Sequence, residues 1–187
     1  SGVVHDEFHS RDFAEKGGEF EMVQLWVNLP AKHKMTKPRY QPLDKKDLPT
    51  VLLQDGITKV KIIAGNFGSS FSPAETFTKI NIYELEGHQN SKVNLNFGDG
   101  TNTLILQLAG SSSIGGQQLG KGNLGIFDRN GVSINLETAE DSKILILNGE
   151  PIEEPLAAHG PFVMNTRDEL IHAFRDFQEG RMGNLVE

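Results

Sequence analysis

The chain has 187 residues with 25 acidic and 18 basic side chains, so its formal net charge is −7. This length allows one well-packed core, or one domain with part of another. The acidic balance argues against direct nucleic-acid binding, for which a basic face is typical. The absence of cysteine excludes disulfides, thiolate metal ligands and a cysteine nucleophile. Because no apolar run reaches the roughly 18–20 residues of a membrane span and no signal peptide opens the chain, we expect a cytoplasmic protein.

The first strand is predicted at residues 22–29. Apolar side chains from Val23 to Leu29 occupy every second position, which is typical of a strand that buries one face. Pro30 ends this pattern. Residues 32–42 are basic and contain prolines, and residues 44–49 are again polar. A domain boundary is therefore expected near residue 43.

Short strands follow this boundary at regular intervals. Their alternating or continuous apolar patterns predict strands at residues 50–54, 58–64, 78–85, 92–97, 103–109, 122–128, 132–137 and 143–148. Glycine-containing turns separate several of them, as at residues 98–100, 115–116 and 130–131. Many short strands joined by such turns indicate an all-β antiparallel sandwich or barrel.

One helix is predicted near the end of the chain, at about residues 166–179. Thr166 and Glu169 have the spacing of a capping box, and three apolar residues then fall on one helical face: Leu170, Phe174 and Phe177. We expect this face to cover one side of a barrel.

Three segments together resemble the pirin family of bicupins. They are Gly-Val-Val-His-Asp-Glu at residues 2–7, the stretch from Gln24 to Gln41, and the region from Asn148 through Gly160-Pro-Phe-Val-Met-Asn-Thr to the helix. The resemblance implies two cupins, each a double-stranded β-helix or jelly-roll barrel, and one short C-terminal helix. Residues 1–43 would be the closing strands of the N-terminal cupin with the inter-domain linker, and Trp26 would pack in or beside that barrel. Residues 44–187 would be the C-terminal cupin with its helix.

The resemblance also implies a metal site in the N-terminal cupin. Members of the family hold Fe(II) or another divalent metal on three histidines and one glutamate, from an early His-x-His and a later His-x-Glu motif. The later motif resembles His5-Asp6-Glu7, whereas the chain begins after the place of the early motif. The chain therefore resembles a pirin without the first part of its N-terminal cupin. Whether this chain alone holds a metal stays open.

The residues themselves are compatible with that chemistry. On a strand, His5 and Glu7 would point to the same side, and an imidazole with a carboxylate suits Fe(II). Without the family resemblance, a lone His-x-Glu is far more often an ordinary surface pair. His9 continues the same alternation and could add a third ligand, although an exposed polar role is the commoner interpretation. The four remaining histidines have no partner at ligand spacing and are interpreted as surface residues: His33, His88, His159 and His172.

A basic cluster precedes the expected boundary and consists of Lys32, Lys34, Lys37 and Arg39. Its ordinary interpretation is a solvated inter-domain segment. The alternative is a docking surface for an acidic protein partner or a phosphate. Tyr40 is the single aromatic residue beside it, so a stacking platform for single-stranded nucleic acid is not expected.

The resemblance implies a quercetin (flavonol) 2,3-dioxygenase in the full-length form, with a flavonol-like molecule and O2 as substrates. His5 would hold the metal, and Glu7 would be both ligand and catalytic base. The alternative is a redox-responsive metal-binding protein that regulates transcription factors or metabolic enzymes without turnover. A third possibility is that the chain has no activity of its own.

Overall fold

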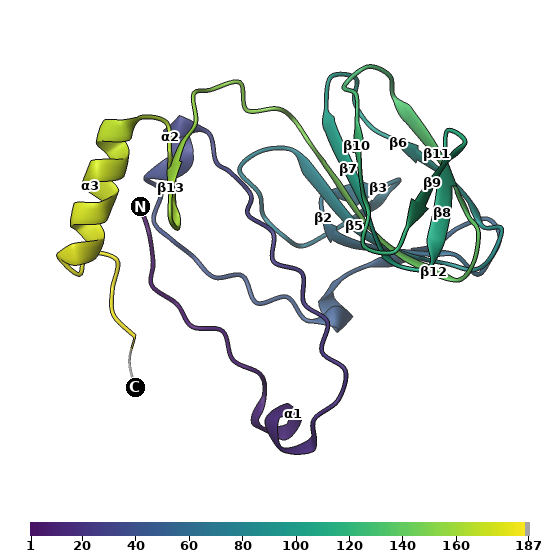
Figure 1. Cartoon of the computed structure of the whole chain (residues 1–187), viewed down its shortest axis with the longest axis horizontal. Helices are drawn as coiled ribbons and strands as arrows, with labels where there is room; N and C mark the ends of the chain where they lie inside the picture. Colours follow the sequence, from purple (N-terminus) through teal and green to yellow (C-terminus); the bar gives the residue numbers. More distant parts are fainter. Residues whose placement is uncertain (186–187) are drawn as a thin grey trace. The chain divides into compact units, whose positions relative to one another are not determined.

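The computed structural model describes residues 1–185 and divides the chain into two compact units. Unit 1 comprises Ser1–Tyr40 together with Ile152–Glu187, and unit 2 comprises Gln41–Pro151. Figure 1 shows that nearly all the strands belong to unit 2. No helix in the described part of the chain has the length and apolar character that crossing a bilayer requires.

Unit 2 contains a six-stranded antiparallel sheet in the order β1-β2-β5-β12-β7-β10. Its strands are β1 (Thr50–Leu52), β2 (Lys59–Ala64), β5 (Ile80–Gly87), β12 (Ser142–Gly149), β7 (Asn102–Ala109) and β10 (Leu124–Phe127). The central strand β12 pairs with β5 along one edge and with β7 along the other. Its middle reads Ile-Leu-Ile-Leu, so both of its faces carry apolar side chains.

A second, four-stranded antiparallel sheet has the order β6-β11-β8-β9. Its strands are β6 (Lys92–Asn96), β11 (Ser133–Thr138), β8 (Ser111–Ile114) and β9 (Gln117–Gly120). A small hairpin of β3 (Asn66–Phe67) and β4 (Ser70–Phe71) and a 3-10 turn, η1 (Lys45–Asp47), complete unit 2.

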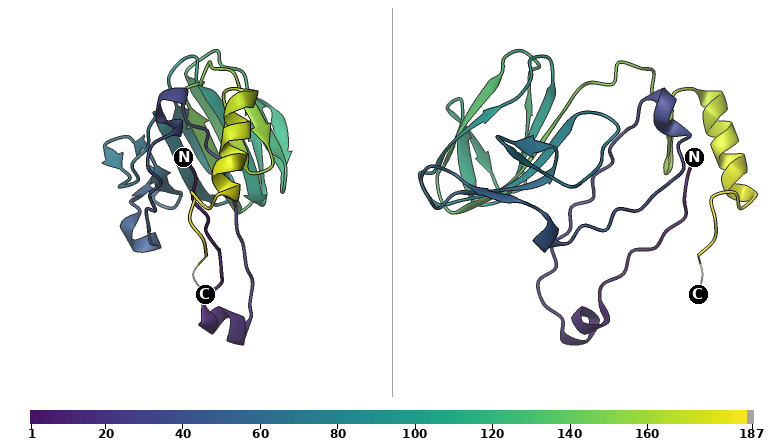
Figure 2. Two further views of the ribbon diagram at one scale, coloured as in Figure 1. Left: turned by 90° about the vertical axis from the view of Figure 1, so that its left-hand side faces the viewer. Right: turned by 180° about the vertical axis from the view of Figure 1, so that it is seen from behind.

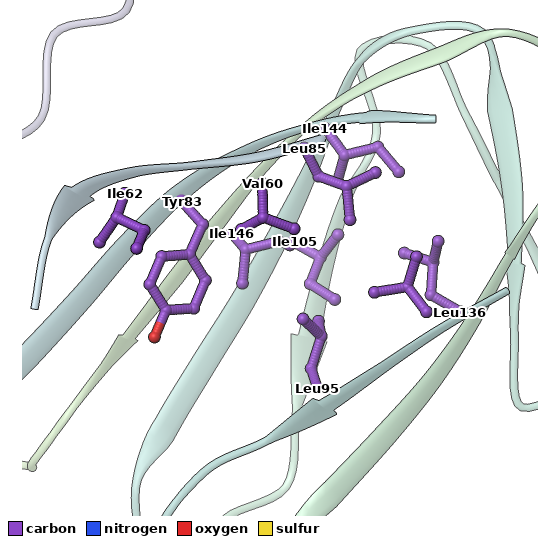
Figure 3. Packing of buried hydrophobic residues seen from close by; sticks show 10 residues of the cluster. Val60, Ile62, Tyr83, Leu85, Leu95, Ile105, Leu136, Ile144 and Ile146 are labelled. Carbon is purple, nitrogen blue, oxygen red and sulfur yellow. The ribbon is translucent and has the colours of Figure 1, made fainter. Parts of the chain in front are cut away.

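The core of unit 2 lies between the inward faces of these two sheets (Figure 3). The six-stranded sheet contributes Val60, Ile62, Tyr83, Leu85, Ile105, Ile144 and Ile146, and the four-stranded sheet contributes Val93, Leu95 and Leu136. These residues occupy alternate positions of their strands, as a half-buried strand requires. All eight strands predicted after residue 43 are present in the structure, with bounds that differ by a few residues at most.

The turn from β7 to β8 depends on a glycine. Gly110 has φ +70°, and a Cβ atom there would lie 2.2 Å from the backbone oxygen of Asp141. Only glycine accepts both the positive φ and this close approach. The turn thereby keeps β8 in the four-stranded sheet while β7 stays in the other.

Unit 1 contains α1 (Arg11–Lys16), α2 (Ala31–Lys34), the hairpin of β13 (Ala157–His159) and β14 (Phe162–Met164), and α3 (Arg167–Gln178). The predicted capping box is confirmed: Thr166 Oγ1 accepts from the amide of Glu169 at 3.2 Å, and Glu169 Oε2 accepts from the amide of Thr166 at 2.8 Å. Figure 2 shows α3 beside the β13–β14 hairpin, with which it is in contact.

The strand prediction for residues 22–29 is wrong. Residues 22–29 and residues 5–9 are extended or irregular and belong to no sheet. A strand exists only where a neighbour satisfies its backbone groups, and no described segment pairs with either stretch. Residues 152–187 group with residues 1–40 in unit 1. The assignment of residues 44–187 to the C-terminal cupin with its helix stays a prediction. The assignment of residues 1–43 to the closing strands of an N-terminal cupin stays a prediction.

Candidate functional site

The first residues of the chain are fixed within unit 1 by backbone contacts. The amide of Val4 donates to the carbonyl oxygen of Met182 at 3.0 Å. Gly2 lies so close to Met182 that a Cβ atom would be 2.5 Å from its sulfur. The amino group of Ser1 donates to the carbonyl oxygen of Lys34 at 2.6 Å, and burial lowers the pKa of that amino group. His5 directly follows this anchored segment.

The predicted ligand pair lies together at the surface. His5 Nδ1 and Glu7 Oε1 are 3.9 Å apart, and their side chains are 63% and 56% exposed. Among residues 1–185 there is no group of three or more histidine, cysteine, aspartate or glutamate side chains able to hold a metal ion. The pair therefore supplies two neighbouring donors of suitable type but not a complete ligand set.

His9 does not join His5 and Glu7. Its ring packs against Phe13 and Phe20, with centroid separations of 5.6 and 4.9 Å. Phe13 and Phe20 are themselves 5.6 Å apart, so the three rings form a small aromatic cluster next to α1. This contact gives His9 a packing role.

An open groove of about 1210 Å³ runs through unit 1, and His5 lies on its wall. Its apolar walls come from the N-terminal segment, the chain before α2, the β13–β14 hairpin and α3, and include Val4, Trp26, Leu29, Leu156, Phe162, Met164 and Phe174. Its polar wall residues include Lys34, Glu169, His172 and Asp176. The combination of mostly apolar walls with a few polar groups is the usual composition of a small-molecule site.

Lys34 is the most buried charged residue of this groove, with 8% exposure. Its Nζ donates to Asn28 Oδ1 at 2.6 Å. The predicted basic surface of Lys32, Lys34, Lys37 and Arg39 must therefore be corrected: Lys34 lies inside unit 1, and only Lys32, Lys37 and Arg39 are exposed. Sequence reasoning missed this because a lysine between two exposed lysines gives no signal of burial.

A hydrogen-bond network joins α2, the chain before β13 and α3. Glu154 Oε2 accepts from the amide of Ala31 at 2.7 Å and from Asn165 Nδ2 at 3.0 Å. Asn165 Oδ1 is buried and has no hydrogen-bond partner among the described residues. The amides of Asn165 and Thr166 both donate to Glu169, which holds the pKa of that carboxyl below its ordinary value. The sequence indicated the Glu169 part through the capping box, whereas Glu154 and Asn165 carried no comparable signal.

The interior of unit 2 has a different character. The ten residues of its core are aliphatic apart from Tyr83, whose hydroxyl donates to the carbonyl oxygen of Asn66. Burial raises the pKa of Tyr83 to about 12. His88 lies outside this core and its Nδ1 is 3.2 Å from Asp141 Oδ1, both side chains being exposed. His159 contacts Phe174 in unit 1 with ring centroids 5.4 Å apart.

The two antiparallel sheets around one apolar interior make unit 2 a cupin. A crystal structure of quercetin 2,3-dioxygenase from Acinetobacter baumannii matches 96% of this chain with a TM-score of 0.91 and 39% identity. The sequence-family model for the pirin C-terminal cupin domain matches residues 82–183. The chain therefore belongs to the pirin family.

Relatives identified by sequence support the assignment to the pirin family. A Pseudomonas aeruginosa protein named as a proposed quercetin 2,3-dioxygenase is 37% identical over 181 residues, which cover 97% of this chain. The pirin of Rattus norvegicus is 30% identical over 187 residues and 97% of this chain. The chain spans 63% of the Pseudomonas protein, 62% of the rat protein and 62% of the Acinetobacter chain.

Proposed function

We propose that this chain is part of a metal-dependent flavonol dioxygenase of the pirin family, with His5 and Glu7 as two of the metal ligands. The observation that carries the proposal is the pair itself, an imidazole nitrogen and a carboxylate oxygen 3.9 Å apart. Its place beside a groove with apolar walls supports a flat aromatic substrate such as a flavonol. Relatives and a solved structure that bear the name quercetin 2,3-dioxygenase support the same reaction class.

His5 and Glu7 supply two of the four metal ligands that the family implies. Nitrogen and carboxylate oxygen are the donors that non-heme Fe(II) and similar divalent metals take, and such sites keep open positions. Among residues 1–185 no group of three or more such side chains completes the set. When bound, the metal would supply Lewis-acid and redox chemistry for the reaction of a flavonol with O2.

The roles of the chain's own residues follow from their chemistry. His5 would orient the site through one ring nitrogen, because a neutral imidazole binds a metal through an unprotonated nitrogen. Glu7 would take the proton of the substrate's hydroxyl group as general base, since its exposed carboxylate lies 3.9 Å from His5, which lines the groove. The apolar walls beside His5 would orient the aromatic rings.

The second candidate is a redox-responsive regulatory protein without turnover. One observation favours it: Lys32, Lys37 and Arg39 are exposed close together in sequence and could contact an acidic protein partner. A cytoplasmic location is part of either proposal.

Oxygen uptake with quercetin separates the two candidates. The protein is isolated from its source cells, its intact mass is recorded, and oxygen consumption is measured with and without quercetin. A dioxygenase should consume one O2 per quercetin, and Glu7→Gln should lower the rate by roughly 100-fold or more, the usual contribution of a general base. His88→Ala, at an exposed histidine of unit 2 that is not among the wall residues of the groove, is the matched control and should keep the native rate. Metal-loaded protein that consumes no oxygen would exclude the enzyme and leave the regulatory candidate.

A further inference from the structure

Two Asn-Gly dipeptides occur in the chain, at residues 130–131 and 148–149, and both lie in unit 2. In such a dipeptide the backbone nitrogen of the glycine can attack the side-chain amide carbon of the asparagine, because glycine has no side chain to hinder the approach. Ammonia leaves and a cyclic succinimide forms, which water opens to aspartate or isoaspartate. The net reaction converts asparagine and water into an acidic residue and ammonia, and it needs no oxidant, reductant or cofactor.

The first dipeptide lies in the loop between β10 and β11. Asn130 and Gly131 are both exposed, and neither belongs to a helix or strand. Gly131 has φ +97°, a conformation that glycine adopts readily and other residues rarely do. The backbone can therefore rearrange toward the Asn130 side chain without the opening of a sheet.

The second dipeptide has the opposite environment. Asn148 is 7% exposed and lies on β12, which pairs with β5 and with β7. Its Nδ2 donates to Thr101 Oγ1 at 2.8 Å and to Thr103 Oγ1 at 3.0 Å, and its Oδ1 accepts from Asn81 Nδ2 at 3.1 Å. These bonds fix the side-chain amide, and the two neighbouring strands fix the backbone. Ring closure at Asn148 would require that the sheet opens first.

Asp99 restrains the reacting nitrogen of the exposed dipeptide. The N–H of Gly131 donates to Asp99 Oδ1 at 2.9 Å. The nitrogen must lose this proton when it bonds to the Asn130 side chain. A hydrogen bond to a carboxylate favours the protonated amide, because the charged acceptor stabilises the N–H.

We propose that Asn130 is a site of spontaneous deamidation, that the hydrogen bond from Gly131 to Asp99 slows the reaction there, and that Asn148 is protected. The new bond joins the Gly131 nitrogen to Cγ of Asn130, and the broken bond releases the side-chain nitrogen as ammonia. Water then opens the ring and leaves a carboxylate at residue 130. The isoaspartate product also has an additional methylene group in its main chain. This modification is independent of any metal and of the proposed dioxygenase reaction.

The modification would loosen one end of the β6–β11 pair. Two further backbone bonds join the segments around it: the amide of Phe97 donates to the carbonyl oxygen of Val132, and the amide of Gly100 to that of Arg129, both at 2.9 Å. A new carboxylate adds negative charge to the loop that already contacts Asp99, and like charges destabilise such a contact. A longer main chain in the isoaspartate form would displace the same bonds.

Peptide mapping of the purified protein is the first test. The protein is incubated at mildly alkaline pH, where the amide nitrogen loses its proton more readily, and mass spectrometry follows both dipeptides in the same sample. Conversion at Asn130 should be at least about 10-fold faster than at Asn148, which reacts only after local opening. Asn130→Gln, whose longer side chain would have to close a larger ring, should remove this modification. Equal conversion at the two asparagines, or none at Asn130, would overturn the proposal.

A pair of carboxylate variants tests the role of Asp99. Asp99→Ala removes the acceptor of the Gly131 N–H and should accelerate deamidation of Asn130 by about 10-fold, as expected for the loss of a hydrogen bond to a charged group. Asp128→Ala removes the same charge from an exposed residue that does not accept from Gly131, and should leave the rate nearly unchanged. The same rate in Asp99→Ala as in the native protein would contradict the restraint by Asp99.

Hydrogen exchange tests the structural consequence. Asn130→Asp reproduces the aspartate product and should accelerate exchange of the Phe97 and Gly100 amides. Asn135→Asp is the matched control, because it adds the same charge on β11 at a side chain that accepts from Asn94 Nδ2 at 2.8 Å and can still do so. It should leave exchange at Phe97 and Gly100 nearly unchanged. Exchange that is equally fast in both variants would show a general effect of charge and would refute the specific loosening proposed.

Discussion

At the scale of single residues, Ile105 shows what the core of unit 2 depends on. It is fully buried between the two sheets, in contact with other aliphatic side chains. Ile105→Ala should lower the free energy of unfolding by about 2–5 kcal/mol, because the substitution removes buried methyl groups and leaves a cavity. Chemical denaturation followed by circular dichroism measures the change.

The matched control for that substitution is Ile126→Ala. Ile126 lies in the same sheet, on β10, but is 76% exposed. Its replacement should change the free energy of unfolding by no more than about 0.5 kcal/mol. Equal effects at the two positions would mean that the sheets do not enclose the core described.

Tyr83 makes a second residue-scale prediction. Burial raises its pKa to about 12, whereas an unfolded tyrosine titrates near 10. The neutral phenol is therefore favoured by folding, and this contribution to stability is complete below about pH 10 and is lost as the pH rises toward 12. In Tyr40→Phe, Tyr83 is the sole tyrosine, so the tyrosinate absorbance at 295 nm reports on it alone. Ionisation with a midpoint near 10 in folded protein would contradict the burial of Tyr83.

At the scale of elements, the cap of α3 links sequence to local stability. Thr166→Ala should destabilise the helix by about 0.5–2 kcal/mol, because the amide of Glu169 loses its acceptor. Hydrogen exchange of the α3 amides measures the loss. Arg167→Ala, at the neighbouring exposed position, is the control and should leave these exchange rates nearly unchanged.

The same cap should respond to acid. Hydrogen bonds from the amides of Asn165 and Thr166 lower the pKa of Glu169 from its ordinary value of 4.5. A carboxylate with a lowered pKa contributes stability that is present above its ordinary value and is lost as the pH falls through the lower, folded value. Exchange of the α3 amides should therefore accelerate below about pH 4.5, beyond the intrinsic trend. Glu169→Gln should show no such additional acceleration.

Elements differ in how far the sequence predicts them. The strands of unit 2 were predictable because alternation such as that in residues 92–97 reports burial on one side, and the capping box at Thr166 is a local signal. Residues 22–29 show the same alternation, yet form no strand, since pairing depends on a neighbour that the pattern does not supply. The short strands β8, β9 and β13 were missed because their polar or mixed sequences show no regular alternation of apolar and polar residues.

The site was less predictable than the fold. The closeness of His5 and Glu7 follows from their sequence spacing and is present without a strand. The burial of Lys34 and the groove around it arise from segments more than 100 residues apart in the chain, such as residues 26–29 and α3. Contacts of that range leave no trace in local composition, so sequence reasoning could not find them.

At the scale of the whole molecule, the two units should differ in stability. Unit 2 has a core of ten buried residues, whereas the buried apolar residues described in unit 1 are Leu170 and Ala173. Regions with few buried apolar contacts open at lower free energy. Limited proteolysis should therefore cut within residues 1–40 before it cuts the sheets of residues 41–151, and mass spectrometry of the first fragments identifies the sites. First cuts inside β5, β7 or β12 would contradict this order.

The central claim is that His5 and Glu7 hold a divalent metal, and metal content tests it most directly. The protein is isolated from its source cells, and metal per polypeptide is measured by mass spectrometry together with the intact mass. We predict close to one divalent metal per polypeptide in the native protein and in His88→Ala, and a loss of most of it in His5→Ala and Glu7→Ala. Metal content that is unchanged in both of the latter variants would contradict the account.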